Sequence, residues 1–249
     1  TEEIALGTIV GSNISNIALI FGVSLVGYST AINPSSKRNF IALGLSVLVA
    51  IYALSDLIIS NFDSLMLLTV LTYFIYIMAI QPNSDEIVVE QNNSSYLNLS
   101  IFLIIGLLSI TIGSNYAVIN GEKIAFLIGI PKLIIGLTVL AIGTSLPELA
   151  VTISALMKQK NQMVLGNIIG SNVLNIAVVM PILGLFSAKS FDPSIITRDM
   201  SVMTILSLIF VMIALSFNYK NIPINVYRLI GIILVSSYII YIGILGGLL

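Results

Sequence analysis

The sequence predicts an all-α polytopic membrane protein built around an inverted-topology repeat. First, 57% of its 249 residues are hydrophobic and only 8% are charged, whereas a soluble domain carries about 25% charged residues. Second, the apolar residues come in runs of about 20, the length of a helix that crosses a hydrocarbon core roughly 30 Å thick. Third, one thirteen-residue segment occurs twice, far apart in the chain.

Hydropathy predicts about eight membrane-spanning helices. Their expected positions are 5–31, 39–55, 57–80, 97–118, 132–157, 163–187, 200–217 and 229–248. Between the third and fourth spans, a polar stretch contains Pro82, three acids and several Asn and Ser residues. We therefore divide the chain into the remainder of a first repeat (1–80, three helices), a linker (81–96) and a second repeat (97–249, five helices).

The repeated segment reads "LGTIVGSNISNIA" from Leu6 to Ala18 and "LGNIIGSNVLNIA" from Leu165 to Ala177, with nine of thirteen positions identical. The two copies lie on the first and sixth predicted spans. A shift of five spans is odd, so the copies cross the membrane in opposite directions. This is the inverted repeat used by many secondary transporters.

Basic residues favour one orientation of these spans. Six Lys or Arg residues lie in the loops after the first, fifth and seventh spans, and four lie on the opposite side. Because cytoplasmic loops carry the excess of Lys and Arg, we expect the first set, and with it the linker 81–96, to be cytoplasmic.

The fifth span contains a single charge, Glu148, within residues 133–157. A charge near the middle of a bilayer costs roughly 2.5–3.5 kcal/mol on insertion scales, and such residues mark functional sites. Thr144 precedes it by four residues and shares its helix face. Pro147 has no N–H, so the carbonyl of Gly143 loses its helical partner. We expect a kinked or broken helix here, with free carbonyls from Ala141 to Thr144.

The two copies of the repeat add polar groups at membrane depth. In each copy a Ser and an Asn lie four residues apart on one helix face, as Ser12 and Asn16 and as Ser171 and Asn175. Asn13 and Asn172 are further amides. Small and polar residues of this kind commonly serve helix packing, but their repetition in two inverted halves favours a shared central site.

The residue types limit what such a site can bind. The chain contains no Cys and no His, so thiolate and imidazole metal sites, and the usual enzyme nucleophiles and proton shuttles, are excluded. Carboxylate, hydroxyl, amide and carbonyl oxygens remain, and these suit Na⁺, Ca²⁺ or Mg²⁺. The sequence contains no basic patch for nucleic acid, and we do not expect an enzyme.

The segment "GTSLPE" at 143–148, followed by "LGNIIGSNVLN" at 165–175, resembles the α-repeats of the sodium/calcium exchanger branch of the cation/calcium exchanger superfamily. The resemblance implies ten helices in two inverted halves, each half with its own Gly-Thr-Ser-x-Pro-Glu helix. This chain has only one such motif. The 159-residue offset between the copies would place the second glutamate about eleven residues before Thr1, so the sequence resembles a member that lacks its first two helices.

The resemblance also implies roles for individual residues. Glu148 would be the carboxylate shared by Ca²⁺ and Na⁺, and Asn16 and Asn175 would lie at the centre of the site. Members usually have Asp at the position of Asn175, which leaves the coupling ion open. The expected cation ligands are Glu148, Thr144, Ala141, Ser145, Ser171, Asn175, Ser12 and Asn16.

The function implied by the resemblance is exchange of Na⁺ for Ca²⁺ across the cell membrane by alternating access, without a cofactor. The expected partners are the two ions and the lipid bilayer, and a monomer is one oligomeric state that the sequence leaves open. Two alternatives remain: antiport of Ca²⁺ against H⁺ or another cation by the same fold, and a non-transporting fragment.

Overall fold

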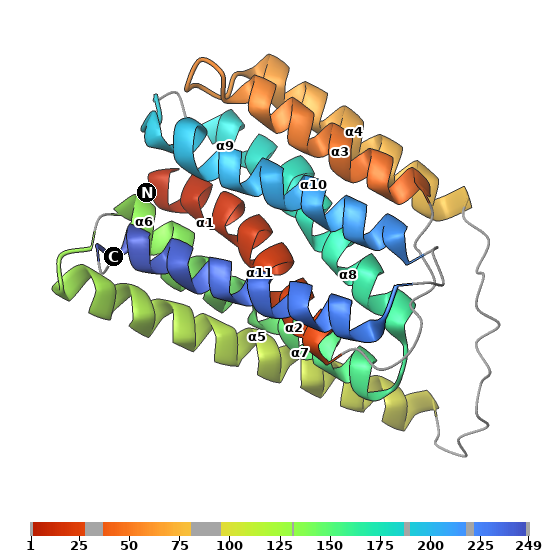
Figure 1. The fold of residues 1–249 in the computed structure, drawn as a ribbon. Helices are drawn as coiled ribbons and strands as arrows, with labels where there is room; N and C mark the ends of the chain where they lie inside the picture. The colour runs from red at the N-terminus through yellow and green to blue at the C-terminus, as the bar shows by residue number, and fades with distance from the viewer. Residues whose placement is uncertain are drawn as a thin grey trace.

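The computed structural model describes residues 2–27, 37–80, 96–130, 132–186, 190–217 and 222–247, and within these ranges all regular secondary structure is helical. The helices lie side by side in one bundle (Figure 1). The prediction of an all-α polytopic protein is confirmed.

The N-terminal part of the bundle contains three helical segments. The first is one continuous segment, in which a π-helical stretch η1 connects two α-helices. The elements are α1 (Glu2–Ser15), η1 (Asn16–Phe21), α2 (Gly22–Val26), α3 (Lys37–Ala53) and α4 (Asn61–Ile80).

The remaining helices follow the linker. Three of their five segments again contain a π-helical stretch. The elements are α5 (Tyr96–Leu127), α6 (Lys132–Ile135), η2 (Gly136–Leu140), α7 (Ala141–Met157), α8 (Asn161–Leu174), η3 (Asn175–Val179), α9 (Met180–Phe186), η4 (Ile195–Met200), α10 (Ser201–Ser216) and α11 (Ile224–Leu245).

Six helical segments in the described part of the chain are long and apolar enough to cross a membrane. The predicted span 39–55 forms the shorter helix α3, of 17 residues, and the predicted span 97–118 lies within α5, of 32 residues. All of the predicted linker except Tyr96 lies outside the described residues. The division into two repeats and the orientation therefore stay predictions.

The segment from α1 to α2 lies at the centre of the bundle, with α3 and α4 at one edge and α5 at the opposite edge (Figure 1). Its side chains are mostly buried, and they contact η2, α7 and α11. The outward faces of the surrounding helices are apolar: Leu48 is 64% exposed and Phe102 is 74% exposed. This reverses the pattern of a soluble protein, because lipid, not water, covers the outer surface.

We expected a helix that is kinked or broken around Gly143 and Pro147, and the break does not occur. Helix α7 runs without interruption from Ala141 to Met157 with Pro147 inside it, and the irregular stretch is the π-helix η2 directly before it. The Thr144 hydroxyl donates to the carbonyl of Leu140 at 2.9 Å and lies 3.3 Å from that of Ala141. Of the carbonyls expected to be free, that of Ala141 thus lies within reach of a side-chain hydroxyl.

Two π-helical stretches begin at equivalent positions of the repeated segment. η1 begins at Asn16 and η3 begins at Asn175, which are 159 residues apart like the copies themselves. Single π-helical turns inside α-helices are frequent at functional sites. The repeat is therefore structural as well as sequential, and its irregular turn coincides with the predicted central Asn residues.

The carboxylate of Asp199 joins the last two helical segments, away from the repeat. Asp199 is fully buried, and both of its carboxylate oxygens accept from the Arg198 guanidinium, at 2.7 and 3.1 Å. The hydroxyl of Tyr241 in α11 donates to the same carboxylate at 2.8 Å. The start of η4 to α10 is thereby connected to the end of α11.

Candidate cation-binding site

Helices α1 and α7 are joined by two pairs of hydroxyl groups. Ser12 Oγ lies 2.9 Å from Thr144 Oγ1, and Ser15 Oγ lies 2.8 Å from Ser145 Oγ. The approach depends on glycine, because a Cβ at Gly11 would lie 2.6 Å from the carbonyl oxygen of Leu137. Small residues allow helix backbones to come this close, and the short hydroxyl side chains can then meet.

Helix α8 is bonded to both of these helices. Asn16 Nδ2 donates to Asn172 Oδ1 at 2.9 Å and to Ser171 Oγ at 3.2 Å, which connects η1 to α8. Asn167 Nδ2 donates to the backbone carbonyl of Glu148 at 3.1 Å, which connects α8 to α7. We call this closed set of bonds between the α1–η1 segment, α7 and α8 the polar ring.

The hydroxyl groups of the polar ring retain oxygen lone pairs that a cation could use. Each hydroxyl has one proton and two lone pairs. Ser171 Oγ donates to the carbonyl of Asn167 at 2.7 Å, and Thr144 donates to that of Leu140. Ser12 is then the donor in its pair with Thr144, and its own lone pairs stay available for a cation.

Three buried oxygens on α7, η1 and α1 have no hydrogen-bond partner among the described residues: Glu148 Oε2, Asn16 Oδ1 and Asn13 Oδ1. A buried polar atom without a partner costs about 1–3 kcal/mol, and each one in a native protein requires an explanation. All three are oxygens, which are the ligand atoms that hard cations such as Ca²⁺ prefer. Asn172 Nδ2 likewise has no partner among the described residues.

Most of the residues predicted for the site are brought together. Ser12, Asn16, Thr144, Ser145 and Ser171 take part through their side chains, and Glu148 through its carbonyl. Ser12, Asn16, Ala141 and Ser145 are at most 5% exposed.

Two predicted residues stand apart from these side-chain bonds. Ala141 participates only through its carbonyl, which lies 3.3 Å from Thr144 Oγ1. Asn175 is half-buried at the start of η3, and its side chain makes no hydrogen bond within the described part of the chain.

The sequence reasoning missed three residues that bond to α7 or lie on it: Ser15, Asn167 and Thr152. Asn167 Nδ2 donates to Thr152 Oγ1 at 3.1 Å as well as to Glu148. A signal for two of them was present. Ser15 and Asn167 are the positions at which the two copies of the repeat differ in chemical class, with Leu174 and Thr8 as their counterparts.

No three His, Cys, Asp or Glu side chains are grouped closely enough to hold a metal ion in the part of the chain that the structure describes. A cation at the polar ring would therefore be bound by one carboxylate and several neutral oxygens. Carboxylate, carbonyl and amide oxygens are the ligands that Ca²⁺ takes in proteins.

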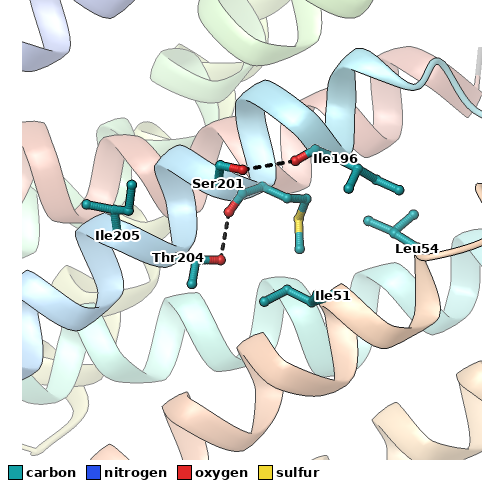
Figure 2. Close-up of a pocket in the computed structure, with 7 residues that line it drawn as sticks. Ile51, Leu54, Ile196, Ser201, Thr204 and Ile205 are labelled. Atoms are coloured by element: carbon teal, nitrogen blue, oxygen red, sulfur yellow. Dashed lines mark hydrogen bonds between the residues drawn. The ribbon is translucent and has the colours of Figure 1, made fainter.

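A cavity of about 350 Å³ lies elsewhere, between α3 and the η4–α10 segment (Figure 2). Its only hydroxyls already donate to backbone carbonyls, Ser201 to Ile196 at 3.3 Å and Thr204 to Met200 at 2.7 Å. The rest of its wall is apolar, so it does not offer ligands to a cation. It is lined by Ile51, Leu54, Ile196, Met200, Ser201, Thr204 and Ile205.

Comparison with known proteins places this chain in a family. A family model described as sodium/calcium exchanger protein matches residues 2–80 and 98–247. The inner membrane protein YrbG of Escherichia coli strain K12 is 31% identical over 98% of this chain and 77% of its own length. The putative antiporter CaxA of Alkalimonas amylolytica is 29% identical over 96% of this chain and 77% of its own length.

A solved structure is similar over nearly the whole chain. It is the sodium-calcium exchanger NCX_Mj soaked with 2.5 mM Na⁺ and 10 mM Sr²⁺. The two chains are 31% identical, with a TM-score of 0.74, over 97% of this chain and 77% of that one.

Proposed function

Because the chain belongs to the sodium/calcium exchanger protein family of multi-pass membrane antiporters, we propose that it exchanges Na⁺ for Ca²⁺ at the polar ring by alternating access. One observation carries the location of the site. Glu148 Oε2 is buried and unpartnered within the described residues, on a helix that the ring bonds hold against α1 and α8. A carboxylate at membrane depth is stable only with a counter-charge or in a cavity, and a bound cation would supply the charge.

The residues present can provide a cation with oxygen ligands. Ca²⁺ takes about 6–8 oxygens. Glu148 offers two carboxylate oxygens, Ser12, Thr144 and Ser171 offer hydroxyls, and Asn16 offers an amide oxygen. Antiport then follows, because a single carboxylate binds Ca²⁺ or Na⁺ but does not neutralise both at once.

The Asn16 amide would have to turn when a cation binds beside Ser171. Its NH₂ group now points at Ser171 Oγ, while its own oxygen has no partner. A cation at Ser171 repels that NH₂ group, so a half-turn of the amide would replace it with the oxygen. A matching half-turn of the Asn172 amide, whose Nδ2 has no partner among the described residues, would keep the bond between the two amides. The same side chain would thus close the ring without an ion and bind the ion when it arrives.

The proposal is tested by Glu148→Gln in the chain reconstituted into vesicles. We expect Na⁺-gradient-driven uptake of radioactive Ca²⁺ to fall to background, because the amide has the same shape and no charge. The matched control is Glu122→Gln, which makes the same change near the end of α5 and should leave uptake intact. Normal uptake by Glu148→Gln would refute the site.

The same vesicles separate the alternatives. Uptake driven by a pH gradient without Na⁺ would show that H⁺ is the coupling ion. Saturable Ca²⁺ binding without uptake under any gradient would identify a non-transporting chain. Uptake that requires Na⁺ and is lost in Glu148→Gln would support exchange of Na⁺ for Ca²⁺.

A further inference from the structure

Helix α7 is bonded on two sides by residues that break the repeat. The two copies differ at four of thirteen positions, and only two of these differences change chemical class: Ser15 against Leu174, and Thr8 against Asn167. Ser15 bonds to Ser145 of α7, and Asn167 bonds to Glu148 and Thr152 of α7. Both residues that differ in chemical class between the copies therefore contact α7, the helix that carries the only carboxylate of the polar ring.

Thr8, the counterpart of Asn167 in the first copy, does not connect two helices through its hydroxyl. The Thr8 hydroxyl donates to the carbonyl of Ile4 in its own helix at 2.7 Å, so it makes no bond between helices. Asn167 instead uses its NH₂ group on α7, with Glu148 O and Thr152 Oγ1 both at 3.1 Å. An amide nitrogen has two hydrogens, so both bonds can form at the same time.

Glu148 directly follows a turn of α7 that lacks one helical hydrogen bond. The preceding residue, Pro147, has no N–H for the carbonyl of Gly143 and its ring crowds that turn. A bond from outside the helix therefore has more influence on where the Glu148 side chain points than it would in an unbroken hydrogen-bond ladder. Thr152, the second acceptor, is fully buried, which fixes the far end of the connection.

Asn167 also bonds to the other side of the ring. Its backbone carbonyl accepts from Ser171 Oγ at 2.7 Å, and this bond orients the hydroxyl that Asn16 reaches from η1. One residue thereby connects the carboxylate-bearing turn of α7 and the ring hydroxyl of α8.

We propose that Asn167 is a positioning residue that sets the distance and orientation of the Glu148 carboxylate relative to Ser171, and so the affinity of the site for Ca²⁺. This inference rests on the proposed function. It predicts a change in the half-saturating Ca²⁺ concentration, whereas a residue that only stabilised the bundle would change the amount of folded protein.

The test variant is Asn167→Thr, which installs the residue that the first copy carries at the same position. Threonine can bond to its own helix, as Thr8 does, and removes the connection to Glu148. We expect the half-saturating Ca²⁺ concentration for uptake to rise about ten-fold, the effect of losing one buried hydrogen bond at a ligand. The matched control, Thr8→Val, removes only an intrahelical bond and should change this value less than about two-fold.

Thr152→Val provides a second, milder variant. It removes one acceptor of the Asn167 amide and keeps the bond to Glu148, so its effect should be clearly smaller than that of Asn167→Thr. Asn167→Thr is first checked for a single folded species by size-exclusion chromatography. If it does not yield one, a half-saturating Ca²⁺ concentration that is higher in Thr152→Val than in Thr8→Val still supports the inference. The absence of such a rise overturns it.

The outcomes also separate this inference from the function. An unchanged half-saturating Ca²⁺ concentration in folded Asn167→Thr overturns the positioning role while Na⁺-driven uptake, and hence the function, stands. If the half-saturating Ca²⁺ concentration rises equally in Asn167→Thr and Thr152→Val, the specific role of the bond to the Glu148 carbonyl is overturned. Uptake that is absent even in the unaltered chain refutes the function and the inference together.

Discussion

Asn175 is the residue at which this chain departs from the pattern that it resembles, and the structure gives it room for change. It is half-buried and stands outside the polar ring. Its counterpart Asn16 is 1% exposed and donates to both Ser171 and Asn172. The same substitution should therefore have opposite consequences at the two positions.

We predict that Asn175→Asp folds normally and binds Ca²⁺ several-fold more tightly, because a second carboxylate attracts a divalent ion more than a monovalent one. Asn16→Asp should instead be destabilised by about 3 kcal/mol, because it replaces two donated bonds with a buried charge facing two oxygens. Calorimetric Ca²⁺ titration and thermal melting of the two purified variants check this. Equal stability of the two variants would contradict the assigned role of Asn16.

At the scale of the elements, the contact between α1 and the η2–α7 segment is the one on which the ring depends. Gly11 faces the backbone of η2, and Gly7 faces that of η2 and of α6 directly before it. A Cβ would lie 2.6 Å from the carbonyl oxygen of Leu137 at Gly11 and 2.8 Å from that of Leu133 at Gly7. Backbone atoms cannot move aside as a flexible side chain does. The separation of these helices is therefore fixed by glycine, and with it the Ser12–Thr144 distance.

We predict that Gly11→Ala lowers the free energy of unfolding by about 1–3 kcal/mol through overpacking and weakens Ca²⁺ uptake, since the helices must separate. Gly44→Ala in α3 is the control, because no atom lies within 4 Å of its added Cβ. Alanine has a higher helix propensity than glycine by about 1 kcal/mol, so that control should be as stable as the unaltered chain or more so. Thermal melting in detergent distinguishes the two.

Much of the fold could be predicted from the sequence because a bilayer imposes simple rules. Runs of apolar residues locate helices, and a lone mid-membrane acid beside a repeated Gly-Ser-Asn motif locates the polar ring. The π-helical turns were not predictable, because they depend on how neighbouring helices pack. The continuity of α7 through Pro147 was also missed, since a proline removes only one hydrogen bond of the helix and the sequence does not show whether the turns on either side still form.

Bonds between distant segments set a further limit. Asn167 bonds to a backbone carbonyl 19 residues away, and Asp199 to the hydroxyl of Tyr241, 42 residues away. Neither acceptor position nor partner follows from residue type or periodicity. The difference between Thr8 and Asn167 in the two copies is a sequence signal for Asn167. Its meaning becomes clear only from the contacts that Asn167 makes with α7 in the structure.

At the scale of the whole molecule, the bilayer is the solvent of the outer surface, so the cost of a charge on that surface depends on its depth in the bilayer. Ile233 lies midway along α11 and is 57% exposed on the outside of the bundle. Ile233→Lys would place a charge against the hydrocarbon core, at a cost of about 3 kcal/mol at a helix centre. Val226→Lys makes the same change in the first turn of α11, where the side chain is 41% exposed and the ammonium group can reach the interface.

We therefore expect Ile233→Lys to reduce the yield of folded protein in the membrane fraction strongly, and Val226→Lys to leave it near that of the unaltered chain. The comparison isolates depth, because helix, charge and outward direction are shared. A soluble bundle would tolerate both changes equally, since water hydrates a surface lysine anywhere. Equal yields of the two variants would mean that α11 does not cross the bilayer at the depth that its length and apolar surface require.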